Sequence, residues 1–267
     1  MDPILVTTGS ADFAAIGYAA VRAAFNETLQ LCADKLSNAD LTLAHEVLGS
    51  DALDEDTPGF YEMLADTALF SRRWTLGARA PARRAIGRIA PKLPVTRDPL
   101  KSAIAALLPK AFFSVLEIEG AHPEGGVSAR DLVDGGRIIR IMDNALEAQS
   151  ATAGKIMLAG RFVDLGPWHI GFGIVIALRK SEAMAICMAL SDDEELEEKR
   201  DDLHELLYSA QLHGHNLVMA ALEPMIMSLA IAIDMDMVDI EELTSELSSV
   251  LPGKPAPKRG RKAAFSG

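Results

Sequence analysis

Three of the six histidines lie close together in the sequence, and such a group is a candidate metal site. They are His204, His213 and His215. On a helix, residues two apart point about 200° away from each other, and Gly214 is placed to break a helix between the last two. A metal site also needs further ligands in a fixed geometry. We therefore expect polar histidines at the surface or at a helix junction, and no metal.

Motifs of known enzyme classes each lack a required residue. His45 and Glu46 begin like the zinc-protease motif, but Gly49 stands where the second histidine is needed. Gly171 and Gly173 match the first two glycines of a dinucleotide loop, yet they lie inside an expected strand and lack the third. Neither a Gly-x-Ser-x-Gly elbow nor a Walker loop occurs. The sequence predicts no catalytic residue and no cofactor, without excluding an enzyme.

Three carboxylates surround an expected hairpin in the middle of the chain. They are Asp131, Asp134 and Asp143. Carboxylates in this arrangement could support a cation, but aspartates also form turns through bonds to their own backbone, without any metal. The second interpretation is the one we expect.

Four cations near the end of the sequence are the feature best suited to a macromolecular partner. They are Lys258, Arg259, Arg261 and Lys262, arranged around Gly260. An Arg-Gly-Arg step flanked by lysines resembles the core of an AT-hook, which lays arginines along the narrow minor groove of A·T-rich DNA. Lys262 replaces the usual proline and the segment occurs once, so any binding would be weak. The alternative is a solubilising basic tail.

The net charge of −12 is unevenly distributed. Residues 72–110 hold ten Lys or Arg against one acid, Asp98, so the rest of the chain is strongly acidic. Trp74 could stack on a base while neighbouring arginines hold phosphates. The other interpretation is that these arginines form intramolecular ion pairs with the acidic residues 192–202. An acidic body repels nucleic acid and acidic membranes, whereas a basic segment can still recruit them.

The elements that would position these residues change from helix to strand and back. Before residue 110, helical spacing with Ser10, Thr57–Pro58 and Asp98–Pro99 as start signals predicts four helices, over residues 10–36, 38–49, 57–74 and 98–108. In the middle, period-two stretches between glycine turns predict five strands, over residues 112–118, 127–133, 137–142, 155–163 and 168–178. Five short strands indicate a small antiparallel β module, either a bent sheet or a barrel.

The clearest strand begins at Trp168. From there to Leu178 every second residue is apolar, while His169, Gly171 and Gly173 begin the opposite face. Small residues on that face allow another backbone or helix to approach closely.

The C-terminal part is expected to be helical. Ser181 is the predicted cap of one helix, and an acidic start opens another whose buried stripe includes Leu196, Leu203, Leu206, Leu207 and Leu212. A near-apolar stretch, residues 217–233, is interrupted by charge and proline, so we interpret it as a core helix rather than a membrane span.

The expected fold class is therefore α+β and mainly helical. We divide the chain into an N-terminal helical region (1–110), a central β module (111–178), a C-terminal helical region packing with the first (179–251) and a disordered basic tail (252–267). Cys32 and Cys187 are expected to be free, small core residues. Free cysteines and the lack of a signal-like start favour a cytoplasmic protein.

The central segment resembles a module found in uncharacterised bacterial proteins, which also occurs beside the SEC-C motif, a short zinc-binding element. The residues that carry the resemblance are spread over residues 98–178: Asp98-Pro99-Leu100, Phe112-Phe113-Ser114-Val115, His122-Pro123, Gly126, Arg130-Asp131-Leu132, Asp143, Leu146 and Arg161-Phe162-Val163. The resemblance implies a bacterial origin and an accessory role, with no catalytic residues. Clustered cysteines are lacking, so the SEC-C zinc site is not expected.

Three functions stay open from the sequence. The first is a non-catalytic accessory or regulatory protein that contacts DNA or RNA through the basic tail. The second is a protein-interaction module, including a homodimer, that uses the sheet or Met-rich helices. The third is a small-ligand binder or an enzyme with a cleft between module and helices, near His169 and Arg161.

Overall fold

The computed structural model describes residues 12–50, 57–71, 84–95, 97–153, 155–190, 196–217 and 219. All of them belong to the first of two units, Met1–Leu222 and Glu223–Gly267. The elements of the described residues follow in chain order: α1 (Phe13–Ile16), α2 (Tyr18–Ala33), α3 (Asn38–Leu48), α4 (Phe60–Phe70), α5 (Ala85–Ile89), η2 (Ala90–Lys92), α6 (Pro99–Leu107), η3 (Leu108–Lys110), β1 (Phe112–Ala121), β2 (Val127–Asp131), β3 (Arg137–Ile141), α7 (Asn144–Ala153), β4 (Ile156–Asp164), β5 (His169–Leu178), α8 (Lys180–Ala189) and α9 (Leu196–Leu212).

The prediction of one continuous first helix is wrong, because the structure has two helices there, α1 and α2. Asp12 caps α1 by accepting a hydrogen bond from the backbone N–H of Ala15, at 3.2 Å, and Ser10 lies outside the described residues. Gly17 then adopts a φ of 87° and interrupts the helix before α2 begins. Glycine tolerates this left-handed angle, so two helices form where the apolar spacing alone indicated one.

The other predicted helix starts agree with the observed ones in some helices and not in others. The side chain of Asp98 accepts from the N–H groups of Leu100 and Lys101, as the Asp-Pro signal predicts for α6. By contrast, α4 begins after Gly59, two residues beyond the predicted Thr57–Pro58 start. The predicted Ser181 cap is also wrong: Arg179 is the residue before α8, and Ser181 lies within it.

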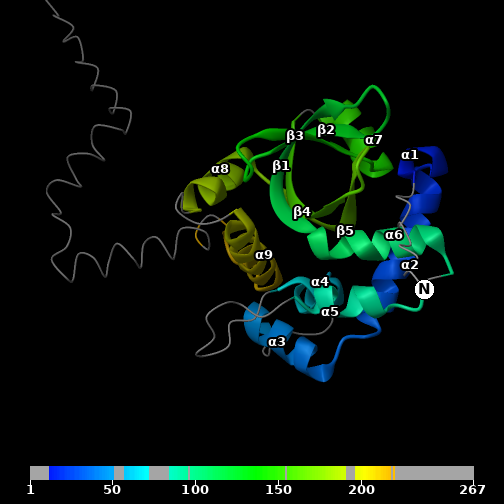
Figure 1. Cartoon of the computed structure of the whole chain (residues 1–267). Helices are drawn as coiled ribbons and strands as arrows, with labels where there is room; N and C mark the ends of the chain where they lie inside the picture. The colour runs from blue at the N-terminus through cyan, green and yellow to red at the C-terminus, as the bar shows by residue number, and fades with distance from the viewer. Residues whose placement is uncertain are drawn as a thin grey trace, which may run out of the picture. The chain divides into compact units, whose positions relative to one another are not determined.

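The five predicted strands are all present, and the sheet closes on itself in the order β1-β2-β3-β5-β4 (Figure 1). Most neighbours are antiparallel, as expected. The exception is β3 with β5, which run parallel and join through a single residue pair, Ile141 and His169. The sheet is therefore mixed rather than fully antiparallel, and its closing seam is short. A seam of this kind is invisible to hairpin signals, which only report antiparallel neighbours.

Helix α7 lies between β3 and β4, where no helix was expected from the sequence. Small five-stranded barrels include the OB-folds. Such folds commonly bind ligands on the outer face of strands 2 and 3. Here that face carries Arg130 and Arg140, which are already paired with Glu119 and Glu124. Topology alone does not assign a function.

Three apolar clusters hold these layers together. One fills the inside of the β module around Leu116, Ile139 and Phe162. The other two lie between the module and the helices, which gather on the side of β1, β4 and β5 (Figure 1). The apolar face of β5 contributes Ile170 and Ile176 to these helix-facing clusters. The alternation predicted from Trp168 onward is thus confirmed, and it faces the helices.

The described helices include none that is long and apolar enough to cross a membrane. The near-apolar stretch of residues 217–233 lies outside the described residues apart from Leu217 and Met219. Cys32 and Cys187 are both free.

Candidate functional site

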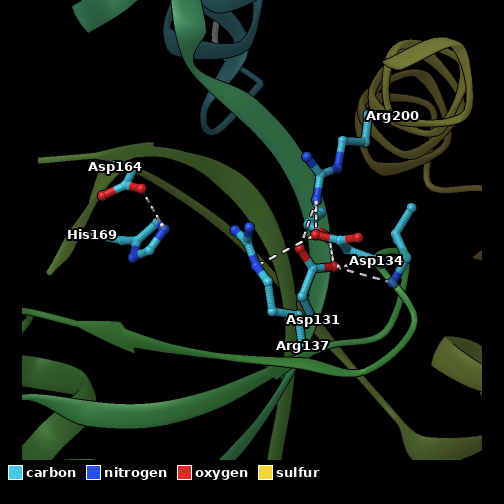
Figure 2. Close-up of polar contacts among 8 residues, drawn as sticks. Asp131, Asp134, Arg137, Asp164, His169 and Arg200 are labelled. Carbon is cyan, nitrogen blue, oxygen red and sulfur yellow. Dashed lines mark hydrogen bonds and ion pairs between the residues drawn. The ribbon is translucent and has the colours of Figure 1, made fainter. Parts of the chain in front are cut away.

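A group of polar side chains gathers at one end of the β module (Figure 2). Asp131 continues the side of β2 that carries the buried Val127 and Ala129, because side chains alternate along a strand. Arg137 of β3 stands opposite Asp131 in the strand register. Arg200 of α9 forms an ion pair with the carboxylate of Asp131. Residues from three separate elements thus meet at this end.

Asp131 is fully buried, and both oxygens of its carboxylate accept hydrogen bonds. One oxygen accepts from the Ser114 hydroxyl and, at 3.1 Å each, from the N–H groups of Val133 and Asp134. The other accepts from Arg200 at 2.7 Å. The guanidinium of Arg200 lies 4.3 Å from the centre of the Phe112 ring. These contacts close the β2–β3 turn and fasten α9 to it, so the bonds of Asp131 have a structural role.

His169 occupies the seam between β3 and β5. Its Nδ1 lies 3.2 Å from the carbonyl oxygen of Arg140, and this atom must carry a proton because the carbonyl only accepts. Its Nε2 lies 3.9 Å from a carboxylate oxygen of Asp164. Burial lowers the pKa of His169, so the ring is neutral at pH 7. The side chain bridges the seam beside the single backbone pair.

The cation hypothesis for the three aspartates is not supported. Asp143 caps the start of α7 by accepting from the N–H groups of Ala145 and Leu146. Within the part of the chain that the structure describes, no three His, Cys, Asp or Glu residues form a possible metal group. Asp131 and Asp143 bond the backbone of a turn and of a helix start, as we expected, whereas the carboxylate of Asp134 pairs with Arg137 and Arg200.

The histidine prediction is partly wrong. His204 lies in the core, only 1% exposed, rather than at the surface. His213 and His215 do not point apart, because α9 ends at Leu212 and Gly214 has a φ of 64°. Their rings stack with centroids 5.4 Å apart at a helix junction.

A buried ion pair joins helix α4 to the outer, helix-facing side of strand β4. Arg161 of β4 and Asp66 of α4 are 1% and 5% exposed. The Nε of Arg161 donates to both carboxylate oxygens of Asp66, at 3.0 and 2.9 Å. The guanidinium also lies 4.4 Å from the Phe70 ring centre. Arginine stays protonated in proteins, so Asp66 must be ionised to neutralise it.

Two side chains of α9 complete this buried network. The Nε2 of His204 lies 3.4 Å from an Asp66 oxygen and 3.2 Å from the Thr67 hydroxyl. Complete burial holds the pKa of His204 well below its usual value, and Arg161 acts in the same direction, so the ring is neutral. Burial likewise raises the pKa of Tyr208 well above its usual value. Burial raises the pKa of Asp66 too, while Arg161 opposes that rise.

Asp66 also belongs to the wall of a pocket between α2, α4 and β5, with a volume of about 270 Å³. We call it the α2–α4–β5 pocket. It is lined by polar residues of the two helices and by apolar residues: Asn26, Gln30, Glu62, Asp66, Leu29, Ala33, Ala65, Leu69, Phe70, Phe172 and Ile174. Asn26 and Gln30 are four apart on α2, and Glu62 and Asp66 are four apart on α4, so each pair shares one helix face. A concave apolar site with a few polar groups is the usual form of a small-molecule site.

The structure separates the two residues that the sequence placed in one cleft. Arg161 points toward the helices, whereas His169 shares a face of its strand with Gly171, which packs on the ring of the interior Phe162. Sequence reasoning missed Asp66, Glu62 and the α2–α4–β5 pocket. The only available signal was the four-residue spacing of Glu62 and Asp66.

One further sequence prediction has an outcome, and two others concern residues that the structure does not describe. Arg84 forms an ion pair with Asp201, which confirms an intramolecular partner for one arginine of the basic segment. Trp74 lies outside the described residues, as do Lys258, Arg259, Arg261 and Lys262.

Comparisons with protein-family models, with curated proteins and with solved structures find no match to this chain. The resemblance to the module beside SEC-C motifs therefore stays a hypothesis, and the site must be judged from its own geometry.

Proposed function

We propose that this protein binds a small organic molecule in the α2–α4–β5 pocket, in an accessory or regulatory role. The observation that carries the proposal is the convergence of polar side chains from two helices over a wall of apolar ones, including Phe70 and Phe172. The volume, about 270 Å³, is just below the range of about 300–1,000 Å³ typical of small-molecule sites, which suits a small ligand.

Binding fits the pocket better than catalysis does. The described residues of its wall include no Ser, Thr, Cys, Lys, Tyr or His that could act as nucleophile or proton shuttle. Asp66 is held by Arg161. Burial raises the pKa of Cys32 to about 12 and that of Cys187 to about 11, so neither thiol is a reactive thiolate at neutral pH.

Filling the pocket with a larger side chain tests this proposal. Ala65 lines the pocket, and Ala65→Trp is expected to abolish the binding of fragments found by ligand-observed NMR against the full chain. Ala23→Trp makes the same change at an exposed position of α2 outside the lining, and it should leave binding unchanged. If every fragment bound both variants equally well, the pocket would not be the binding site.

A second candidate function rests on the basic tail. We propose that Lys258, Arg259, Arg261 and Lys262 give weak binding to A·T-rich duplex DNA. The cations come from the tail alone in this proposal, because Arg130 and Arg140 of the β module are each paired with a glutamate.

Removing residues 252–267 should therefore reduce binding to an A·T-rich duplex at least about tenfold in fluorescence anisotropy at low salt. Binding by the full chain should weaken steeply as salt rises, since each phosphate contact releases counterions. Equal binding with and without the tail, or binding that ignores salt, would count against the proposal.

A further inference from the structure

The wall of the α2–α4–β5 pocket has an uneven chemistry. Its polar side chains are two carboxylates, from Glu62 and Asp66, and two amides, from Asn26 and Gln30. Among the described residues of the wall there is no Lys, Arg or His. Asp66 is balanced by Arg161 behind it, and Arg22, one turn before Asn26 on α2, is engaged by the carbonyl oxygen of Gly171, which leaves Glu62 as the wall charge without an ion-pair partner among the described residues. A cation is therefore favoured in this pocket over an anion.

The hydrogen-bonding capacity of the wall points the same way. Gln30 donates one of its two amide N–H groups to Asp34 at 2.8 Å, and its carbonyl oxygen has no partner among the described residues and can accept from a ligand. Among the residues that the structure describes, Glu62 has no side-chain hydrogen bond or ion pair, nor does Asn26. The Glu62 carboxylate only accepts, so a ligand rich in N–H donors is the complement.

The remaining wall sets the shape of the rest of the ligand. The rings of Phe70 and Phe172 meet edge to face, with centroids 5.2 Å apart and an angle of 86°. Leu29, Leu69 and Ile174 extend this apolar wall. An apolar group placed here loses contact with water and gains packing contacts, which makes it favourable to bury.

We propose that the ligand is an organic ammonium ion, a primary amine on a small apolar or aromatic body. This inference rests on the proposed function. The ammonium group would be held by Glu62 at the rim with the amide oxygens of Asn26 and Gln30, and the apolar body would lie against Phe70 and Phe172. The three N–H donors of an ammonium group match several acceptors converging from two helices.

Three probes of similar shape separate charge from shape in the test. They are 2-phenylethylamine, 2-phenylethanol and phenylacetate, each titrated into the full-length protein while the methyl signals of Leu29, Leu69 and Ile174 are followed by NMR. The amine is expected to bind with a Kd on the order of 1 mM, as suits a fragment, and at least about tenfold more tightly than the anion. Raising ionic strength from about 0.05 to about 0.5 M should weaken the amine alone.

Charge removal at the rim gives the decisive comparison. Glu62→Gln keeps the shape and is expected to weaken the amine about fivefold while leaving the alcohol unchanged. Glu46→Gln makes the same change on an exposed face of α3 outside the lining and should alter neither.

The outcomes distinguish the ligand class from the site. If phenylacetate or the alcohol bound as tightly as the amine, and Ala65→Trp still abolished that binding, the ammonium inference would be overturned and the pocket would remain a binding site. If the amine caused no shift of these methyl signals at about 10 mM, the ammonium inference would also fail. If Ala65→Trp left all fragment binding intact, the proposed function itself would fail.

Discussion

Arg161→Met is expected to lower the free energy of unfolding by about 3–5 kcal/mol. The change leaves the carboxylate of Asp66 buried at 5% exposure without its guanidinium partner. A buried charge that loses its partner keeps the full cost of leaving water. Urea denaturation of the two proteins at pH 7 measures the difference directly.

A pair with a half-exposed arginine provides the matched control. Arg88 pairs with Asp40 at 2.8 Å; the Asp40 side chain is only 10% exposed, but that of Arg88 is 50% exposed, so water screens the interaction, and Asp40 keeps its bonds to Ser37 when Arg88 is replaced. Arg88→Met should therefore cost less than about 1 kcal/mol. Combining Arg161→Met with Asp66→Asn removes both buried charges, and the double variant should lose less stability than the sum of the single changes. Simple additivity, or equal losses for Arg161→Met and Arg88→Met, would contradict the buried pair.

Gly126→Ala should cost about 3 kcal/mol or more, because the added methyl group has no space. A Cβ at this position would lie 2.2 Å from the carbonyl oxygen of Ile141, and this backbone atom belongs to β3. The φ of Gly126, 75°, adds strain for any residue with a side chain. The turn between β1 and β2 would have to move away from β3.

The neighbouring glycine separates the clash from the backbone strain. Gly125 also has a positive φ, 92°, but a Cβ there would meet nothing closer than 3.9 Å. Gly125→Ala should cost only about 1 kcal/mol, from backbone strain alone. Urea denaturation with circular dichroism at both positions tests the difference. Similar losses at the two glycines would mean that the turn is not packed against β3 as described.

Local patterns predicted what depends on local physics. Apolar alternation from Trp168 identified β5, because a strand with one buried face must alternate. The Asp98–Pro99 pair identified the start of α6 because the cap and the fixed proline φ act within one turn. In contrast, α7 escaped prediction because it buries little: Leu146 is its one fully buried apolar side chain among those described. A helix without an apolar stripe gives no periodic signal.

The candidate site depends on contacts between distant segments, and no local pattern reports those. Arg161 lies in a strand, where a charged residue would indicate a solvent face, yet Asp66 of α4 makes its burial tolerable. His204 lies on a helix with many charges, yet its side chain is buried beside the carboxylate of Asp66. The parallel β3–β5 pair likewise joins strands that are not neighbours in sequence. These features follow from tertiary packing alone.

A crystal of the full-length protein soaked with 2-phenylethylamine would show the binding site itself. We expect electron density for the probe in the α2–α4–β5 pocket, with its ring against Phe70 and Phe172. The ammonium nitrogen should lie about 3 Å from a carboxylate oxygen of Glu62. An empty pocket in a crystal saturated with the amine, or density for the probe elsewhere, would contradict this binding site.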